Sequence, residues 1–333
     1  MRPWHLTRRA RSCAAVVFVA AAVVAVSPAA AQRSEPEYPG RPIRVIVPVA
    51  PGGGVDTMAR TIAPLLAGRI GQSVVVDNRA GGGGSIGAEL TARAAADGYT
   101  IMLASSAFVL HSLLYPARYD PLRDFAPVTE VVQHPYVLLV GASVPAANAR
   151  EFVSWAKAAK AHVNYASSGN GSLIHLTGEL FNSAAGLKMV HIPYKGIAQA
   201  YPDLFSGQVH ATFGSILSSL PHITSTRLRA LAVTSLKRAT RLADTPTLDE
   251  SGFSRFDVTQ WYGVFAPAQT PGPRVARLQK EIAWVLTQPD TQARIASEGS
   301  HAVGNASLQF AHMIRAEMTK WSGLIRTAGI RTE

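Results

Sequence analysis

Short apolar runs alternate along the chain with segments in which apolar residues recur every three or four positions. The short runs are typical of strands buried on both faces, and we expect strands at 43–49, 73–77, 100–104, 136–140, 163–166, 189–193, 209–213, 228–234 and 261–266. The periodic segments are typical of amphipathic helices, expected at 56–66, 85–96, 149–159, 172–185, 199–205, 275–286 and 310–321. This alternation predicts an α/β protein whose parallel strands are joined by helical crossovers.

The strand–helix pattern restarts after Phe125, which indicates two α/β units. If the strand near Trp261 returns to the first unit, the second unit is an insertion and the chain crosses between the units twice. We therefore expect two α/β domains joined by a two-strand hinge, with a ligand cleft between them. The expected boundaries are 32–132 with 262–333 for domain 1, and 133–261 for domain 2.

The first 31 residues have the pattern of a signal peptide. Met1–Ser12 is cationic without an acid, 13–26 is apolar, and Ala29–Ala31 offers small residues for cleavage before Gln32. The apolar run has 14 residues, whereas a membrane-spanning helix needs about 20. We expect cleavage near Ala31 and export from the cytoplasm.

Composition narrows the function classes. Of 333 residues, 47% are hydrophobic and 16% charged, which excludes intrinsic disorder. The one cysteine, Cys13, lies in the expected leader, so the mature chain has no disulfide or cysteine metal ligand. Without the leader's four arginines, 28 basic and 21 acidic residues remain, scattered rather than in a basic stripe. A nucleic-acid partner is thus disfavoured. We expect no bound metal, since the histidines lack the spacing of metal ligands. We also expect no cofactor.

A glycine loop follows the first expected strand. Gly52, Gly53 and Gly54 lie between that strand and a helix for which Asp56 is the expected N-cap, with Val55 beside it. Free N–H groups and the helix dipole favour anions there, and glycines let the backbone touch a ligand. The alternative is a tight turn. A Walker loop is excluded, because no Gly-Lys-Ser/Thr follows.

A second glycine loop, RAGGGGSIG at 79–87, matches two motifs. A dinucleotide fingerprint would need an acid about 20 residues further on, where Ser105 and Ser106 stand instead. A hydrolase elbow would place its serine directly after a strand, but several residues separate Asp77 from Ser85, which we expect to be an ordinary N-cap. A secreted serine hydrolase using Ser85 or Ser168 is kept as the alternative function.

The second unit carries a comparable loop within YASSGNGSLIH at 165–175. Its hydroxyl, amide and backbone N–H donors come from Ser168, Gly169, Asn170, Gly171 and Ser172. His175, in the first turn of the next helix, could donate one hydrogen bond while neutral; a helix cap with a core histidine is the alternative. Tyr194, after another strand, could line a cleft or fill the core. Both units thus place neutral donors at strand ends.

Taken together, these segments resemble one family along residues 38–330. The matching segments are PGGGVDTMAR (51–60), VVVDNRAGGGGSIGAE (74–89), DGYTIMLASS (97–106), YDPLRDFAPVT (119–129), NYASSGNGSLIHLTGELF (164–181), HIPYKG (191–196), LRALAVTSLKR (228–238) and WYGVFAPAQTP (261–271). The chain is similar to the substrate-binding receptors of tripartite tricarboxylate transporters, the Bug-type extracytoplasmic binding proteins.

The resemblance implies a type II periplasmic binding fold and a periplasmic receptor. It implies capture of a mono-, di- or tricarboxylate or an acidic amino acid by a monomer, which a membrane permease then receives; a sensor kinase as partner stays open. The implied ligand-binding residues are Gly52, Gly53, Gly54, Val55, Asp56, Asn78, Gly84, Ser85, Ser105, Ser106, Ser168, Gly169, Asn170, Gly171, Ser172, His175, Tyr194 and Gly196. After Tyr-Lys-Gly, proteins of this family often have a small or hydroxylated residue, whereas this chain has Ile197. The difference indicates that this side of the pocket is more apolar.

Overall fold

The computed structural model describes residues 38–330. The expected leader, 1–31, and its cleavage point lie outside the described residues. Within 38–330, no helix combines the length and the apolar character that crossing a membrane requires.

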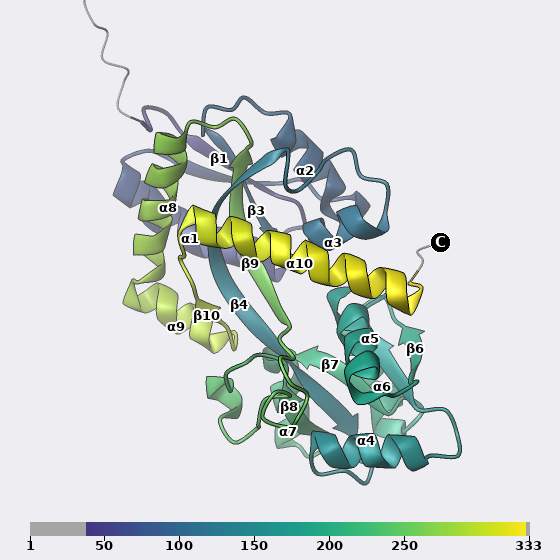
Figure 1. The fold of residues 1–333 in the computed structure, drawn as a ribbon. Coiled ribbons are helices and arrows are strands. Elements are labelled where there is room, and N and C mark those ends of the chain that lie inside the picture. Colours follow the sequence, from purple (N-terminus) through teal and green to yellow (C-terminus); the bar gives the residue numbers. More distant parts are fainter. Residues whose placement is uncertain (1–37, 331–333) are drawn as a thin grey trace, which may run out of the picture. The chain divides into compact units, whose positions relative to one another are not determined.

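One sheet of ten strands organises the described chain, with the order β2-β1-β3-β9-β4-β7-β5-β6 and with β8 and β10 also paired to β4 (Figure 1). The strands are β1 Ile43–Val47, β2 Val74–Asn78, β3 Thr100–Ser105, β4 Phe125–Gly141, β5 Asn164–Ser167, β6 Val190–Pro193, β7 Ala211–Ser215, β8 Leu228–Val233, β9 Thr259–Pro267 and β10 His301–Ala302. The expected strands are therefore confirmed, with ends that shift by at most two residues apart from β4.

Strand β4 belongs to both halves of this sheet. Residues 125–135 pair with β9, and residues 136–141 pair with β7 and β8. We call the part built on β1, β2, β3, β9 and the first half of β4 lobe 1, and the part built on β5 to β8 and the second half of β4 lobe 2. The expected strand at 136–140 is thus only the end of a 17-residue strand, because polar residues and two prolines at 125–135 obscure the strand pattern.

The helices cover both faces of the sheet. They are α1 Gly54–Ile70, α2 Ser85–Ala92, α3 Ala107–Leu114, α4 Ala149–Ala158, α5 Leu173–Ala185, α6 Tyr201–Ser206, α7 Ile216–Thr224, α8 Gly272–Leu286, α9 Pro289–Ser297 and α10 Ser307–Ala328, with 3-10 turns η1 Gly82–Gly84, η2 Ile197–Ala200 and η3 Thr240–Leu242. In lobe 1, α1 and α8 pack against one face, and α2, α3 and the start of α10 against the other. The apolar helix faces thus bury both sides of the parallel strands.

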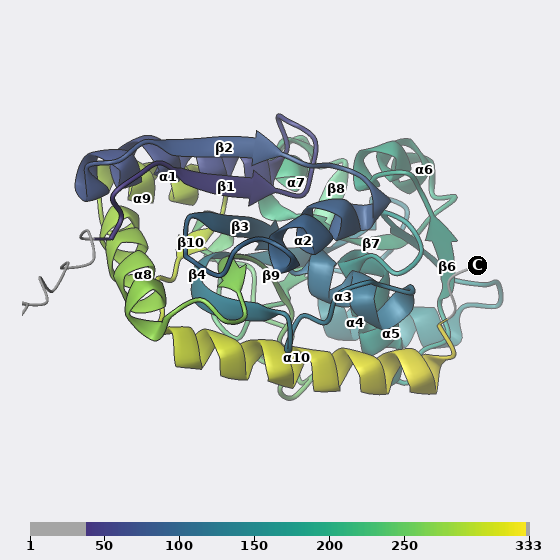
Figure 2. The ribbon, with the colours of Figure 1, turned by 90° about the horizontal axis from the view of Figure 1, so that it is seen from above.

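Helix α10 contacts both lobes. Its Phe310 packs with Trp261 and Phe265 of β9 in lobe 1, whereas Trp321 and Leu324 belong to the apolar cluster of lobe 2. Figure 2 shows this helix running along the sheet as far as α5. A third element therefore joins the lobes in addition to β4 and the segment that enters β9.

Two expected caps and three helices differ from the sequence prediction. The N-cap of α1 is Gly53 rather than Asp56, and the N-cap of α2 is Gly84 rather than Ser85. The glycines take these positions because the carboxylate of Asp56 is bound elsewhere and Gly84 adopts φ 98°. Helices α3, α7 and α9 were not predicted: they are short, and α7 contains a proline.

Candidate functional site

The strand directions place the loops of the two lobes opposite each other. Strands β1, β2 and β3 are parallel, and β3 runs antiparallel to β9, which runs antiparallel to β4. Their carboxyl ends therefore point along β4, toward lobe 2. Strands β5, β6 and β7 are parallel, and β7 runs antiparallel to β4, so their carboxyl ends point back toward lobe 1. The loops after all six strands face the space that β4 crosses.

The pairing register gives the size of this space along the strand. Ser105, which ends β3, pairs with Tyr262, and Tyr262 pairs with Val132 of β4. Ser215, which ends β7, pairs with Tyr136 of β4. Four residues of strand separate the two levels, which corresponds to about 13 Å.

The glycine loop of lobe 1 presents backbone rather than side chains. Gly52, Gly53 and Gly54 are exposed, and Gly52 adopts φ 89°. The first-turn N–H groups of α1 have no acceptor inside the helix. A Cβ on Gly54 would overlap the hydroxyl of Tyr262 in β9. The loop thus lies against Tyr262, and the N–H groups in the first turn of α1 are available to an anion.

Asp56 and Asn78 hold this loop in place through hydrogen bonds. The buried Asp56 carboxylate accepts hydrogen bonds from Gly52 N at 2.8 Å, Asn78 Nδ2 at 2.9 Å and Arg60 Nε at 3.0 Å. Asn78 Nδ2 also donates to Val49 O at 3.1 Å. The hydrogen bond from Arg60, with that from Gly52, lowers the pKa of Asp56 to about 2. The polar atoms of both residues are therefore committed within lobe 1.

The other two loops of lobe 1 bring small residues and hydroxyls to the same edge. Gly84 is buried, and Ser85 is half-buried at the start of α2. Ser105 and Ser106 are buried at the end of β3. Among residues 38–330, Ser106 Oγ has no hydrogen-bond partner although it is buried. A buried hydroxyl without a partner at a strand's carboxyl end is a candidate donor to a ligand.

The loop of lobe 2 after β5 is ordered by internal hydrogen bonds. Ser167 Oγ donates to Gly169 O at 3.0 Å, and Gly169 N donates back to it at 3.1 Å. Gly171 N donates to His175 Nδ1 at 3.0 Å, so the neutral ring carries its proton on Nε2. Ser172 caps α5 by accepting from His175 N at 3.2 Å. Ser168 and Asn170 make no such loop contacts and are half-buried and exposed, respectively.

Two stacked imidazoles support this loop. The rings of His175 and His191 lie 3.7 Å apart with an interplanar angle of 7°, and His191 Nε2 is 2.6 Å from Ser167 Oγ. Burial lowers the pKa of His175. Burial, together with the charge of His175, lowers the pKa of His191 to about 4. Both rings are therefore neutral near pH 7.

The loop after β6 is partly built into the core of lobe 2. Tyr194 packs against the apolar cluster of that lobe, and its hydroxyl donates to Asp203 Oδ2 at 2.6 Å. Burial and this hydrogen bond raise the pKa of Tyr194 to about 12. Gly196 precedes the η2 turn, and Ile197 packs on both lobe 2 clusters. Of the two roles expected for Tyr194, packing accounts for its contacts.

Sequence reasoning missed two residues at this edge. Ser215 ends β7 and caps α7, and its side chain accepts from Ser218 N. Its position as a hydroxyl directly after the apolar run 209–213 is the same signal that marked Ser168. Tyr262 of β9 lies against Gly54 and, edge to face, against His134. Its proximity to the glycine loop depends on long-range strand pairing, which no local signal reports.

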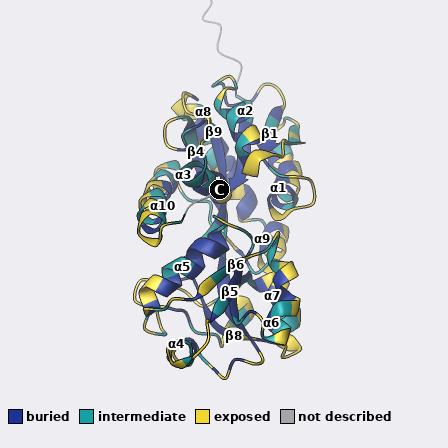
Figure 3. Ribbon diagram, turned by 90° about the vertical axis from the view of Figure 1, so that its right-hand side faces the viewer, coloured by how far each residue is buried: buried dark blue, intermediate teal, exposed yellow. Residues whose placement is uncertain are grey.

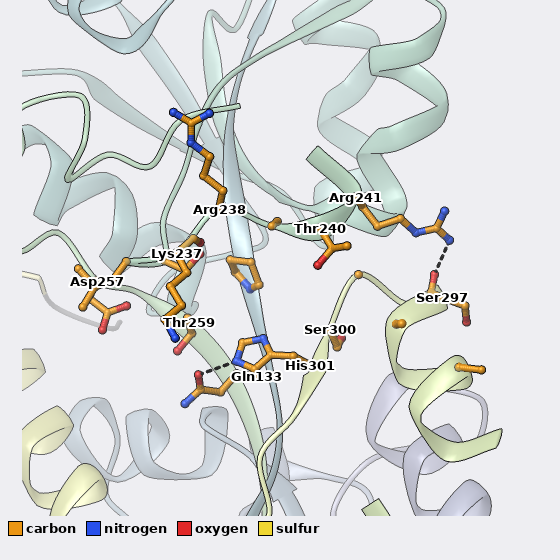
Figure 4. A pocket seen from close by; sticks show the side chains of 17 residues that line it. Gln133, Lys237, Arg238, Thr240, Arg241, Asp257, Thr259, Ser297, Ser300 and His301 are labelled. Carbon is orange, nitrogen blue, oxygen red and sulfur yellow. Dashed lines mark hydrogen bonds between the residues drawn. The ribbon is translucent and has the colours of Figure 1, made fainter. Parts of the chain in front are cut away.

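A cavity of about 730 Å³ lies apart from these loops (Figure 4). Its walls are formed by the segment 235–241, the end of α9, β10 and parts of β4 and β9. None of the candidate residues at the six loops lines it.

The fold and the facing loops define the class of protein. Two α/β lobes that are joined by β4 and by the segment entering β9, with loops of the two lobes opposed to each other, form the architecture of the type II periplasmic binding proteins. Figure 3 shows buried strands at the centre of each lobe, with exposure concentrated on the outer loops and helices.

Comparison with known proteins identifies the family. The model of the tripartite tricarboxylate transporter family receptor matches residues 58–330. The chain is 37% identical over 311 residues to BugT of Bordetella pertussis, a match that covers 92% of this chain and 95% of BugT. The chain belongs to this receptor family, which confirms the resemblance.

Two solved structures of similar proteins contain carboxylates. The chain resembles R. palustris Rpa4515 with adipate at a TM-score of 0.73 and 33% identity, covering 88% of this chain and 99% of that one. It also resembles MatC from Rhodopseudomonas palustris with bound malate, at a TM-score of 0.69 and 30% identity. That match covers 86% of this chain and 100% of MatC. These TM-scores and sequence identities confirm the predicted fold class.

Proposed function

We propose that this protein captures a small carboxylate between the facing loops of its two lobes and presents it to a membrane permease. The observation that carries the proposal is the opposed placement of neutral donors at the carboxyl ends of six strands. The family and the adipate and malate in similar proteins support the choice of a carboxylate. The protein acts by binding, without catalysis.

Lobe 1 supplies backbone donors for the carboxylate. The N–H groups at the start of α1 lie at the positive end of a 17-residue helix, which favours negative charge. A carboxylate that accepts two or three N–H bonds stays ionised. The nearby Asp56 is ionised too, but Arg60 at 3.0 Å offsets its charge. Asp56 and Asn78 are positioning residues that hold the loop, and Ser106 adds a hydroxyl.

Lobe 2 supplies the opposing donors. Ser168, Asn170 and the backbone of the 168–172 loop face lobe 1, and His175 presents its Nε2 proton after Nδ1 has accepted from Gly171 N. A ligand that bonds both lobes stabilises the closed arrangement relative to the open one, since only the closed arrangement satisfies both sets of donors. The permease then distinguishes closed from open. Cleavage near Ala31 would release the mature receptor, a monomer, in the periplasm.

Calorimetry on residues 32–333 tests the proposal with adipate, malate, citrate and aspartate, and with glucose as an uncharged control. A ligand at a hundredfold excess over its Kd should add about 2.7 kcal/mol of stability. Gly53→Val should abolish binding while the protein stays folded, because Gly53 has negative φ and a Cβ at this position would have only Ala50 O within 4 Å, at 3.9 Å.

Ser168→Ala should also abolish the stability increase, whereas Ser183→Ala, an exposed serine on α5, should bind as the wild type does. Carboxylate binding that survives both Gly53→Val and Ser168→Ala would contradict the proposed site. Turnover of ester substrates that is lost in Ser85→Ala would contradict a purely binding function.

A further inference from the structure

The cavity beside the hinge has walls from both lobes. Lobe 2 contributes the segment Ser235–Arg241, which follows β8, and lobe 1 contributes the end of α9 and residues 299–301. Gln133 and Pro135 of β4 and Thr259 of β9 form its floor. Its volume of about 730 Å³ falls in the range of small-molecule sites.

Four basic side chains line this cavity, and two of them are already engaged. Arg238 Nε donates to Glu250 Oε2 at 2.9 Å, and Arg241 Nη2 donates to Ser297 O at 3.1 Å. Among residues 38–330, Lys237 forms no ion pair. Figure 4 shows Lys237 and His301 on the same side of the cavity, close to Thr259 and Gln133. Lys237 is therefore the cationic group available to a ligand, and the imidazole of His301 lies beside it.

Lys237 lies close enough to His301 for its charge to act on the imidazole. Burial lowers the pKa of His301, and the charge of Lys237 lowers it further. Behind His301, burial and then the charge of His301 lower the pKa of His134 to about 4. The acid in the lining is Asp257, which Figure 4 shows beside Lys237; burial raises its pKa, and the charge of Lys320 lowers it. The imidazole of His301 is thus neutral near pH 7, and an anion bound beside Lys237 would raise its pKa.

The rest of the lining is suited to a molecule with a polar head and a short apolar part. Ser300 and Thr259 offer hydroxyls, and His301 Nε2 lies 3.2 Å from Gln133 Oε1. The lining also contains apolar side chains, namely Leu236, Ala239, Ala293 and Ala296. Leu236 is 54% exposed.

We propose that this cavity is a second ligand site, which binds an oxyanion with a short alkyl portion between Lys237 and His301. The anionic group, phosphate or carboxylate, contacts those two residues and Thr259, and the alkyl portion lies on Leu236 and the alanines. Because both lobes line the site, its occupancy and the angle between the lobes are coupled. This last step rests on the proposed function, whereas binding in the cavity does not.

Titration with n-butyl phosphate and with inorganic phosphate tests the site, because neither probe is a carboxylate. The readout is the Hε1 NMR signal of His301, assigned by its absence in His301→Gln. We expect the wild type to bind butyl phosphate more tightly than phosphate, since alkyl groups gain from burial, and the pKa of His301 to rise on binding.

Lys237→Met keeps the apolar stem of the side chain and should weaken binding about tenfold or more. Lys188→Met, an exposed lysine before β6, is the matched control and should bind as the wild type does. Gly53→Val, which blocks the carboxylate site, should leave butyl phosphate binding unchanged. Equal affinity in Lys237→Met and wild type, loss of binding in Gly53→Val, or no shift of the His301 signal at millimolar probe would each overturn the proposal.

Discussion

Replacing Asp56 by asparagine should release the glycine loop from the body of lobe 1. The carboxylate accepts from Gly52 N, Asn78 Nδ2 and Arg60 Nε. Asparagine keeps one acceptor oxygen and turns an NH₂ donor toward a group that also donates. The side chain of Arg60 is 53% exposed, so water can replace the hydrogen bond between Arg60 and residue 56. Asp56 is only 2% exposed, so water cannot replace its hydrogen bonds from Gly52 and Asn78.

The structure gives the size of this effect. A hydrogen bond to a charged group contributes about 1.5–3 kcal/mol, and an unsatisfied buried donor costs a similar amount. We expect Asp56→Asn to lower the free energy of unfolding by about 3 kcal/mol and Tm by roughly 5 °C. Carboxylate affinity should fall about tenfold, because the N–H groups of the loop are no longer held in place.

Urea unfolding at several pH values is the assay. The pKa of Asp56 is about 2 in the folded protein and ordinary in the unfolded chain. Its contribution is therefore complete above about pH 4 and is lost as the pH falls toward 2. The stability gap between wild type and Asp56→Asn should narrow over that window, while Asp244→Asn, at an exposed aspartate, should leave stability unchanged. Equal stability of Asp56→Asn and wild type at pH 7, or a gap independent of pH, would refute the reasoning.

Three further predictions concern other parts of the site. Ser106→Ala should weaken carboxylate binding about tenfold in calorimetry without lowering Tm, because the buried Oγ has no partner among residues 38–330; a lowered Tm with unchanged affinity would contradict this. Gly87→Ala should cost about 1–3 kcal/mol in urea unfolding, since its Cβ would lie 2.9 Å from Pro48 Cα, and an unchanged midpoint would count against the packing. Wild-type stability should fall as the pH drops from about 6.5 to 4, because His191 stays neutral in the folded protein while it protonates in the unfolded chain. This fall should be smaller in His191→Gln, and identical pH profiles of the two proteins would contradict the prediction.

The sequence predicted the strands and the glycine-rich and serine-rich loops because each signal is local. Apolar runs such as 43–49 and 100–104 are bounded by turn residues, and both proved to contain parallel strands. The full length of β4 could not be predicted, because Thr129, Glu130 and Gln133 break its apolar pattern. How far these side chains are buried is determined by β9 and β10, which pair with this part of β4 from more than 100 residues away in the sequence.

The site could be located from the sequence but not resolved into roles. Strand ends identified the loops, and parallel pairing gathers them at one edge. Whether a side chain faces the ligand or its own lobe depends on partners distant in sequence: Asp56 bonds Asn78, and Tyr194 bonds Asp203. The hydroxyl of Ser106 could be singled out only once its surroundings were known. The second cavity depends on α9, a helix without a clear sequence signal.

A crystal structure of residues 32–333 with adipate tests the central claim most directly. We expect one carboxylate of the ligand to accept from backbone N–H groups of 53–56 while the 168–172 loop of lobe 2 bonds the same molecule. Adipate held by one lobe alone, or seated beside Lys237 with both loops empty, would contradict the account.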